Sequence, residues 1–185
     1  MKPLAPDDEL WGALDEGALL TEILDDFYTR VYADPDLSPF FEGTDPEWIR
    51  QKQYSFLHSK FTGQDTYFGN RPRNAHHWMV ISHELFDHRL DLMRRCLRDA
   101  ELPPRLVERW IAYEEVFRKQ IVKPAPVPLK VGGVPRPLEG LETLVIEVGS
   151  LCDQCGEPID QGQQAQYHVR TGALYCTSCR PLSYS

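Results

Sequence analysis

The sequence predicts an all-α fold over its first two thirds and a small, cysteine-stapled β unit at its end. Apolar residues recur at helical spacing up to residue 123. After it, the β-branched run 144–148 predicts a strand, and residues 167–175 predict a small hairpin. Between them, residues 124–141 hold five of the fifteen prolines, which remove backbone donors and fix φ. We therefore expect a helical domain over residues 1–123, a semi-rigid linker over 124–141 and a second domain over 142–185.

Composition and charge narrow the function classes. The chain has 185 residues, 42% of them hydrophobic, and its 20 basic against 28 acidic residues give a net charge of −8. An acidic protein disfavours nucleic acid and anionic membranes, because phosphate binding depends on basic excess. No apolar run approaches the roughly 20 residues of a membrane span, and acidic Asp7, Asp8 and Glu9 stand where a signal peptide would be apolar. We expect a soluble, cytoplasmic protein.

Four substantial helices are predicted from apolar stripes. The stripes consist of Leu20, Leu24, Phe27 and Val31; of Ile49, Gln53 and Phe56; of Phe86, Leu90, Met93 and Leu97; and of Leu106, Trp110, Tyr113, Phe117 and Ile121. Thr44 or Asp45 caps the second helix, and Pro46 lies in its first turn. Ser82 caps the third helix, and Pro103-Pro104 separates the third from the fourth. A glycine-containing loop, residues 62–75, joins the second helix to the third.

Polar residues stand at two positions on these apolar faces. Tyr28 follows Phe27 on the first stripe, and Gln53 belongs to the second stripe. A buried tyrosine or glutamine needs a hydrogen-bond partner, so each would be costly in a featureless core. His76-His77 follows the long loop and precedes the third helix, a junction from which a histidine can reach into the bundle. These features are unusual for a plain helical bundle.

The same residues carry a resemblance to a known family. The stretch from Asp26 to Gly43, DFYTRVYADPDLSPFFEG, closely resembles the B-to-C region of truncated haemoglobins, the short two-over-two globins, and most of all their group I. The likeness covers about residues 10 to 122. It continues in register through Gln53, Gly63, Tyr67, Gly69, His76, Ile81 and Phe86.

The resemblance implies a haem site and a role for each matching residue. His76 would be the proximal ligand of haem iron, with His77 as the alternative. Tyr28 would hydrogen-bond a bound gas, and Gln53 would orient Tyr28 or contact the ligand. The implied haem-binding set is His76, Tyr28, Gln53, Phe41, Ile49, Phe56 and Arg89. The domain would bind O2, NO and CO at a five-coordinate ferrous haem b.

The sequence departs from the family at three places. Asp15-Glu16-Gly17 stands where the first helix corner often has a double glycine, and the second glycine motif is reduced to Thr62-Gly63. Arg89 stands near the distal haem face, where the family usually has an apolar or tryptophan side chain. A guanidinium keeps its charge, so Arg89 meets a haem propionate, reaches solvent or faces the ligand.

The end of the chain carries a strong metal-binding pattern. Two Cys-x2-Cys pairs, Cys152 with Cys155 and Cys176 with Cys179, are separated by twenty residues. Four thiolates complete a tetrahedral shell that suits zinc, so the segment resembles a zinc ribbon; a rubredoxin-like iron site and a redox dithiol are the alternatives. His168 could replace a cysteine only with an unusual loop. Few basic residues accompany the pairs, which favours protein contact over DNA reading.

The leading interpretation is a haem protein that binds diatomic gases and carries a structural zinc ribbon. Three alternatives stay open from the sequence. One is a haem enzyme, either a nitric-oxide dioxygenase or a peroxidase-like protein. The second is a gas-responsive regulator that acts through the zinc ribbon, and the third is a globin-like scaffold without haem.

Overall fold

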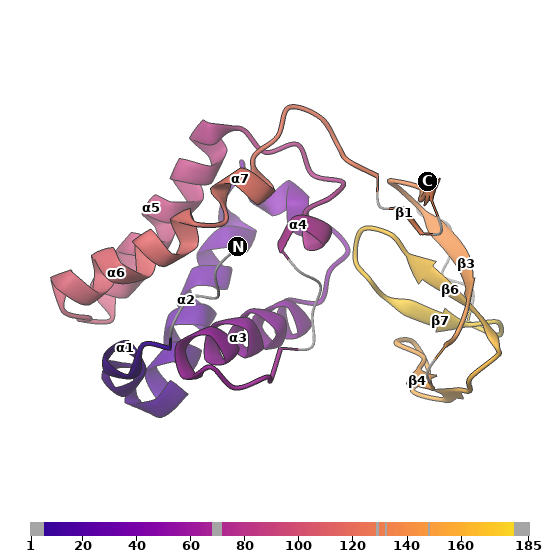
Figure 1. Ribbon diagram of the computed structural model, residues 1–185, viewed down its shortest axis with the longest axis horizontal. Helices are drawn as coiled ribbons and strands as arrows, with labels where there is room; N and C mark the ends of the chain where they lie inside the picture. Colours follow the sequence, from indigo (N-terminus) through magenta and orange to yellow (C-terminus); the bar gives the residue numbers. More distant parts are fainter. Residues whose placement is uncertain (1–5, 68–71, 129, 132, 148, 180–185) are drawn as a thin grey trace. The chain divides into compact units, whose positions relative to one another are not determined.

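A computed structural model describes residues 6–67, 72–128, 130–131, 133–147 and 149–179, and Gly69 lies outside them. The chain divides into two compact units, Met1–Ala125 and Pro126–Ser185. The first is helical and the second is built of short β-strands (Figure 1). No helix in the described ranges combines the length and the apolar character that a bilayer span requires.

The helical unit is built on two helix pairs. Helix α2 packs against α3, α5 packs against α6, and α2 also contacts α5 (Figure 1). The four predicted helices are thus present. The elements of the unit are α1 (Asp8–Ala13), η1 (Asp15–Gly17), α2 (Ala18–Ala33), η2 (Ser38–Phe41), α3 (Pro46–Thr62), α4 (Pro72–Ala75), α5 (His83–Asp99), α6 (Pro104–Glu115) and α7 (Arg118–Ile121).

The long helices begin where the predicted caps lie. The Asp45 carboxylate accepts a hydrogen bond of 2.9 Å from the Glu47 amide at the start of α3. The Ser82 hydroxyl accepts one of 3.1 Å from the Leu85 amide at the start of α5. Each cap satisfies a backbone donor that the first helical turn leaves without a partner.

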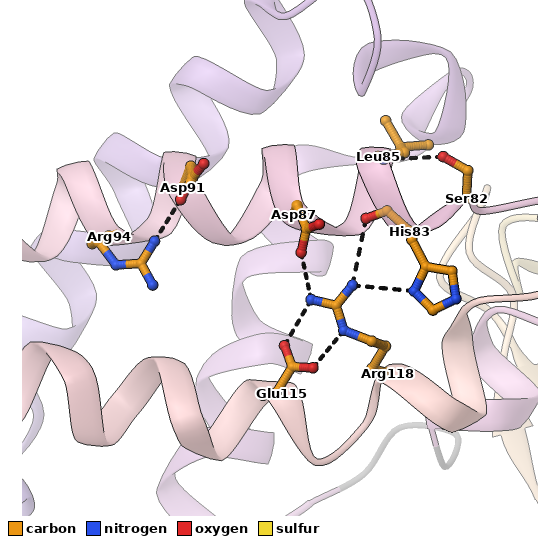
Figure 2. A network of polar contacts seen from close by, with 8 residues as sticks. All are labelled: Ser82, His83, Leu85, Asp87, Asp91, Arg94, Glu115 and Arg118. Carbon is orange, nitrogen blue, oxygen red and sulfur yellow. Dashed lines mark hydrogen bonds and ion pairs between the residues drawn. The ribbon is translucent and has the colours of Figure 1, made fainter.

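The fourth helix differs from the prediction, because it breaks before Ile121. Helix α6 ends at Glu115, and α7 begins again at Arg118. The turn between them buries Phe117, whose ring lies 5.4 Å from that of Phe56. Figure 2 shows Arg118 in this turn, bonded to Glu115 and reaching Asp87 on α5. The break therefore fixes the last short helix against α5 and turns an aromatic ring inward.

The first helix corner takes the left-handed conformation without a second glycine. Asp15 and Glu16 both have φ of 51°, and Gly17 has φ of 105°. Residues with side chains visit this region at a cost of about 1–2 kcal/mol each. A Cβ atom on Gly17 would lie 2.2 Å from the Tyr54 hydroxyl oxygen. The corner thus needs glycine only where the backbone meets α3.

The core of the helical unit is aromatic and aliphatic. Its largest fully buried side chains are those of Trp110, Phe27 and Phe61. The rings of Phe61 and Trp110 lie 5.3 Å apart, edge to face. Cys96 is also buried here, with 1% of its surface exposed, far along the chain from the other four cysteines.

The second unit is an assembly of short antiparallel strands. Strand β3 (Leu141–Val145) pairs with β6 (Gln164–His168), which pairs with β7 (Leu174–Cys176). The predicted hairpin is β6–β7, and the strand predicted around residues 144–148 begins three residues earlier. Strands β4 (Ser150–Leu151) and β5 (Pro158–Ile159) form a second, two-stranded ladder.

The stretch predicted as a linker is partly structured. The boundary between the units follows Ala125, and β1 (Lys130–Val131) pairs with β2 (Val134–Pro135) inside the proline-rich stretch. Further along, Arg136 and Glu142 form an ion pair of 2.5 Å that attaches this stretch to β3. Antiparallel pairing tolerates proline at a strand end, because a missing donor there breaks no ladder bond.

Candidate functional site

The two histidines that follow α4 are both held through one ring nitrogen. Nδ1 of His76 lies 2.7 Å from the carbonyl oxygen of Pro72, and Nδ1 of His77 lies 2.7 Å from that of Asn74. A carbonyl oxygen only accepts, so each Nδ1 carries the proton and each Nε2 is left with a lone pair. Metal-binding histidines usually show this arrangement, because the second bond fixes the tautomer and the ring.

The surroundings of the two imidazoles differ. His77 is 5% exposed, and its Nε2 is buried without a partner in the described part of the chain. His76 is half-buried. Burial and the nearby charges of Arg89 and Lys123 lower the pKa of His76 to about 4, although the hydrogen bond to Pro72 opposes this shift. His76 is therefore neutral near physiological pH, as a metal ligand must be.

The segment from His76 to Ile81 is also held by hydrogen bonds from Lys123, near the end of the helical unit. Nζ of Lys123 donates a hydrogen bond of 2.6 Å to the carbonyl oxygen of His76. The Lys123 amide donates to the Ile81 carbonyl at 3.0 Å, on the other side of the same loop. One residue thus holds the segment 76–81 at both ends.

Tyr28 projects from α2 into an aromatic cluster. It is 6% exposed, and its ring lies 5.9 Å from the ring of Phe41 on η2, edge to face. Burial raises the pKa of Tyr28, so the phenol keeps its proton and can donate a hydrogen bond. The structure therefore brings Tyr28 and Phe41 together, as the family register predicts.

Ile49, Gln53 and Phe56 occupy one stripe of α3, and all three are half-buried. The Phe56 ring lies 5.1 Å from the Tyr67 ring. No hydrogen bond joins Gln53 to Tyr28 within the described ranges, so their predicted cooperation stays a prediction.

Arg89 faces a partner that the sequence reasoning missed. Its guanidinium forms an ion pair with the carboxylate of Glu114 on α6, which is 6% exposed. The Trp110 indole donates a hydrogen bond of 2.8 Å to the other carboxylate oxygen. The sequence feature that could have revealed this partner is Glu114, a charged residue four positions after Trp110 on an otherwise apolar stripe. A charge in such a position needs a buried partner of opposite sign.

The four cysteines of the second unit converge. The sulfurs of Cys152, Cys155, Cys176 and Cys179 all lie within 4.8 Å of one another, and those of Cys155 and Cys176 are 3.9 Å apart. A zinc–sulfur bond of about 2.3 Å in a tetrahedron separates the sulfurs by about 3.8 Å. This geometry fits a zinc ribbon.

Backbone amides support the thiolate form at the most buried sulfur. The Cys176 amide lies 3.4 Å from the sulfur of Cys152, which is 2% exposed. Burial alone would raise the pKa of the Cys152 thiol, but backbone donors, that of Cys176 foremost, lower it to about 6. His168 lies apart in the β6–β7 turn, where its Nδ1 accepts from the Thr171 amide at 3.2 Å.

Comparisons with known proteins agree with this geometry. A model of the bacterial-like globin family matches residues 10–123. The chain belongs to this family. A group 1 truncated hemoglobin of Chlamydomonas moewusii is 40% identical over 57 residues, which are 31% of this chain and 33% of the relative. The match thus spans about a third of that relative's length.

Solved structures show the same fold. The truncated hemoglobin of Tetrahymena pyriformis superposes with a TM-score of 0.57 at 22% identity, covering 61% of this chain and 97% of that one. The hemoglobin of Chloroflexus aurantiacus gives 0.55 at 28% identity, with 62% and 97% covered. The truncated oxygen-avid haemoglobin of Bacillus subtilis gives 0.54 at 27% identity, with 62% and 98% covered. The prediction of a truncated globin fold is confirmed, and the family match ends before the cysteine-bearing unit.

Proposed function

We propose that this globin holds haem b through His76 and binds O2 and other diatomic gases reversibly. The observation that carries the proposal is the 2.7 Å hydrogen bond from His76 Nδ1 to the Pro72 carbonyl. It leaves Nε2 as an unprotonated donor on a neutral imidazole, the form that binds iron. The family membership of residues 10–123 supports the same assignment.

The neighbouring side chains fit a large, flat, apolar cofactor. Phe41, Ile49 and Phe56 come from η2 and α3, and each is half-buried and packed against the core. Apolar walls of this kind bury a ligand while a few polar groups orient it. We assign these three residues to packing against the porphyrin and to excluding water. Haem, when bound, supplies the iron at which a diatomic gas binds.

Two polar residues would recognise the gas. Tyr28 keeps its proton because burial disfavours the phenolate, so it donates a hydrogen bond to a polar ligand. Gln53 offers a second donor from α3. With haem bound, O2 would carry partial negative charge and would benefit from both donors, whereas CO would benefit little. The oxygen-avid description of the Bacillus subtilis relative agrees with O2 as the ligand.

Absorption spectra of the purified protein test the haem proposal. We expect a ferric spectrum with stoichiometric haem, a five-coordinate ferrous spectrum after dithionite, and a CO complex. His76→Ala should lose most of the haem, because it removes the proposed protein bond to iron. His77→Ala is the matched control on the next residue and should retain it. Normal haem content and an unchanged CO spectrum in His76→Ala would disprove the assignment.

For the second unit we propose one structural zinc ion bound by the four cysteines. The support is the convergence of four sulfurs within 4.8 Å, together with a core of only a few buried residues around Ile146 and Ile159. A unit of this size needs a metal or disulfides for stability. We infer protein contact as the use of this ribbon, in keeping with the few basic residues that accompany the cysteine pairs in the sequence.

A further inference from the structure

Arg89 and Glu114 form a charged pair inside the helical unit. The side chains come from α5 and α6, and they are 27% and 8% exposed respectively. Each carboxylate oxygen of Glu114 receives one donor, from Arg89 and from the Trp110 indole. The glutamate is therefore satisfied on both oxygens. Burying such a pair usually costs more than it returns, so stability alone gives little reason for it.

Arg89 keeps most of its donors available. A guanidinium has five N–H groups, and the bond to Glu114 uses only Nη1. No other hydrogen bond from Arg89 is made within the described ranges. Its guanidinium carbon lies 5.0 Å from the centre of the Phe27 ring, the residue that precedes Tyr28 on α2. The guanidinium thus lies against α2, the helix that carries Tyr28.

The charge of Arg89 acts on Tyr28. Burial raises the pKa of Tyr28, and Arg89 opposes that rise. The positive charge therefore lies where it can act on a polar group beside the phenol.

A second arginine–glutamate pair joins the same helices on their outer face. Arg94 contacts Glu108 at 3.3 Å and also Asp91, as Figure 2 shows for the bond to Asp91. Glu108 and Asp91 are more than half exposed. Solvent-exposed pairs of this kind contribute little. The inner pair differs at its carboxylate: Glu114 is 8% exposed and Glu108 is 58% exposed, whereas Arg89 and Arg94 are 27% and 25% exposed.

We propose that Arg89, held by Glu114, makes the pocket selective for small anions that coordinate ferric haem iron. The inference rests on the proposed function, since it requires haem in this pocket. Arg89 donates hydrogen bonds and positive charge to the anion, and Tyr28 supplies a neutral donor beside it. Glu114 orients the guanidinium and offsets part of its charge, so it limits the affinity while holding the geometry.

Azide and fluoride binding to the ferric haem protein near neutral pH tests the proposal, with CO binding to the ferrous protein as the neutral comparison. The double variant Arg89→Met/Glu114→Gln removes both charges, leaves no unpaired buried ion and is the variant expected to fold. It should lower the affinity for azide and fluoride by about ten-fold or more, because a hydrogen bond to a charged group is lost. It should change CO affinity by less than about two-fold. Arg94→Met, the outer-face control, should change neither.

The single variant Glu114→Gln should change the azide affinity in the opposite direction from the double variant. It keeps the shape of the side chain and removes the charge that offsets Arg89, so azide should bind more tightly than in the wild type. Equal azide affinity in the wild type and the double variant would overturn the proposal.

Haem dissociation, measured by the transfer of haem to an apoglobin acceptor, tests the remaining explanation, in which Arg89 binds a haem propionate. Faster haem loss with unchanged anion affinity in the double variant would make Arg89 a propionate anchor and also overturn the inference. A wild-type protein that takes up no haem would overturn the proposed function itself.

Discussion

At the scale of single residues, hydrogen-bond direction decides more than residue type. His76 and His77 are adjacent and chemically identical, and each donates a hydrogen bond from its Nδ1 to a backbone carbonyl oxygen. They differ in exposure and in the charges around them, with Arg89 and Lys123 acting on His76. Tyr28 can donate because a phenol keeps its proton at neutral pH, and burial raises its pKa further.

Tyr28→Phe should speed the release of O2. The variant removes the phenol donor and little volume, and a hydrogen bond to a charged group is worth about 1.5–3 kcal/mol. We expect the O2 dissociation rate to rise by about ten-fold or more, measured by stopped-flow mixing of the oxygenated protein with excess CO. The CO dissociation rate should change far less, and equal effects on both gases would contradict the role.

Gly17→Ala should destabilise the helical unit by about 1–3 kcal/mol. Gly17 has φ of 105°, and a Cβ there would lie 2.2 Å from the Tyr54 hydroxyl. Urea unfolding followed by circular dichroism measures the change. Gly12→Ala in α1 is the matched control: nothing lies within 4 Å of its Cβ, and the substitution should be neutral or stabilising. Equal stability of the two variants would mean that the corner tolerates a side chain.

At the scale of elements, the loop from His76 to Ile81 is held by the segment that ends the helical unit. Helix α7 follows a break after Glu115 and lies against α4, and Lys123 then bonds to the backbone of His76 and Ile81. The loop that bears the proposed iron ligand therefore depends on residues more than forty positions away in sequence.

Lys123→Met should loosen the proximal histidine without removing it. The Nζ bond of 2.6 Å to the His76 carbonyl is lost while the aliphatic stem remains. We expect haem to dissociate several-fold faster and the iron–histidine stretching band to shift in the resonance Raman spectrum of the ferrous protein. Lys119→Met, on the exposed face of α7, should leave both unchanged. An unshifted band in Lys123→Met would limit Lys123 to a structural role.

At the scale of the whole molecule, two compact units offer two different sets of candidate metal ligands. Residues up to Ala125 offer an imidazole among apolar and aromatic side chains, and residues from Pro126 on offer four sulfurs. Each unit has its own hydrophobic cluster. Because each cluster is complete within its unit, we expect the two to lose structure separately.

Cys152→Ser should remove zinc and unfold the second unit while the haem spectrum stays intact. Binding by a structural site is coupled to folding, so loss of one ligand removes most of the folding free energy of the unit. Metal analysis, limited proteolysis after residue 125 and the Soret band measure the three outcomes. Cys96→Ser, in the helical unit, should keep its zinc. A wild-type protein without zinc, or a zinc-replete Cys152→Ser, would contradict the site.

The sequence by itself determined the helical domain, its long helices and the cysteine site. Apolar spacing sets which face of a helix is buried, and caps such as Asp45 and Ser82 act on neighbouring backbone atoms, so both can be predicted locally. The two Cys-x2-Cys pairs meet where the turn between β4 and β5 lies beside β7, with the Asp153 amide donating to the Leu174 carbonyl at 2.8 Å. The candidate haem residues came from register with the family rather than from any local rule.

Only the tertiary structure decided how distant residues pair. Glu114 as the partner of Arg89, Lys123 on the His76 carbonyl and the break after Glu115 all depend on contacts between elements far apart in sequence. The hairpin inside the proline-rich stretch depends likewise on strand pairing, which proline content alone does not reveal. A charge, a donor or a turn has no preferred partner until packing places one beside it, and the cost of an unpaired buried charge then selects that arrangement.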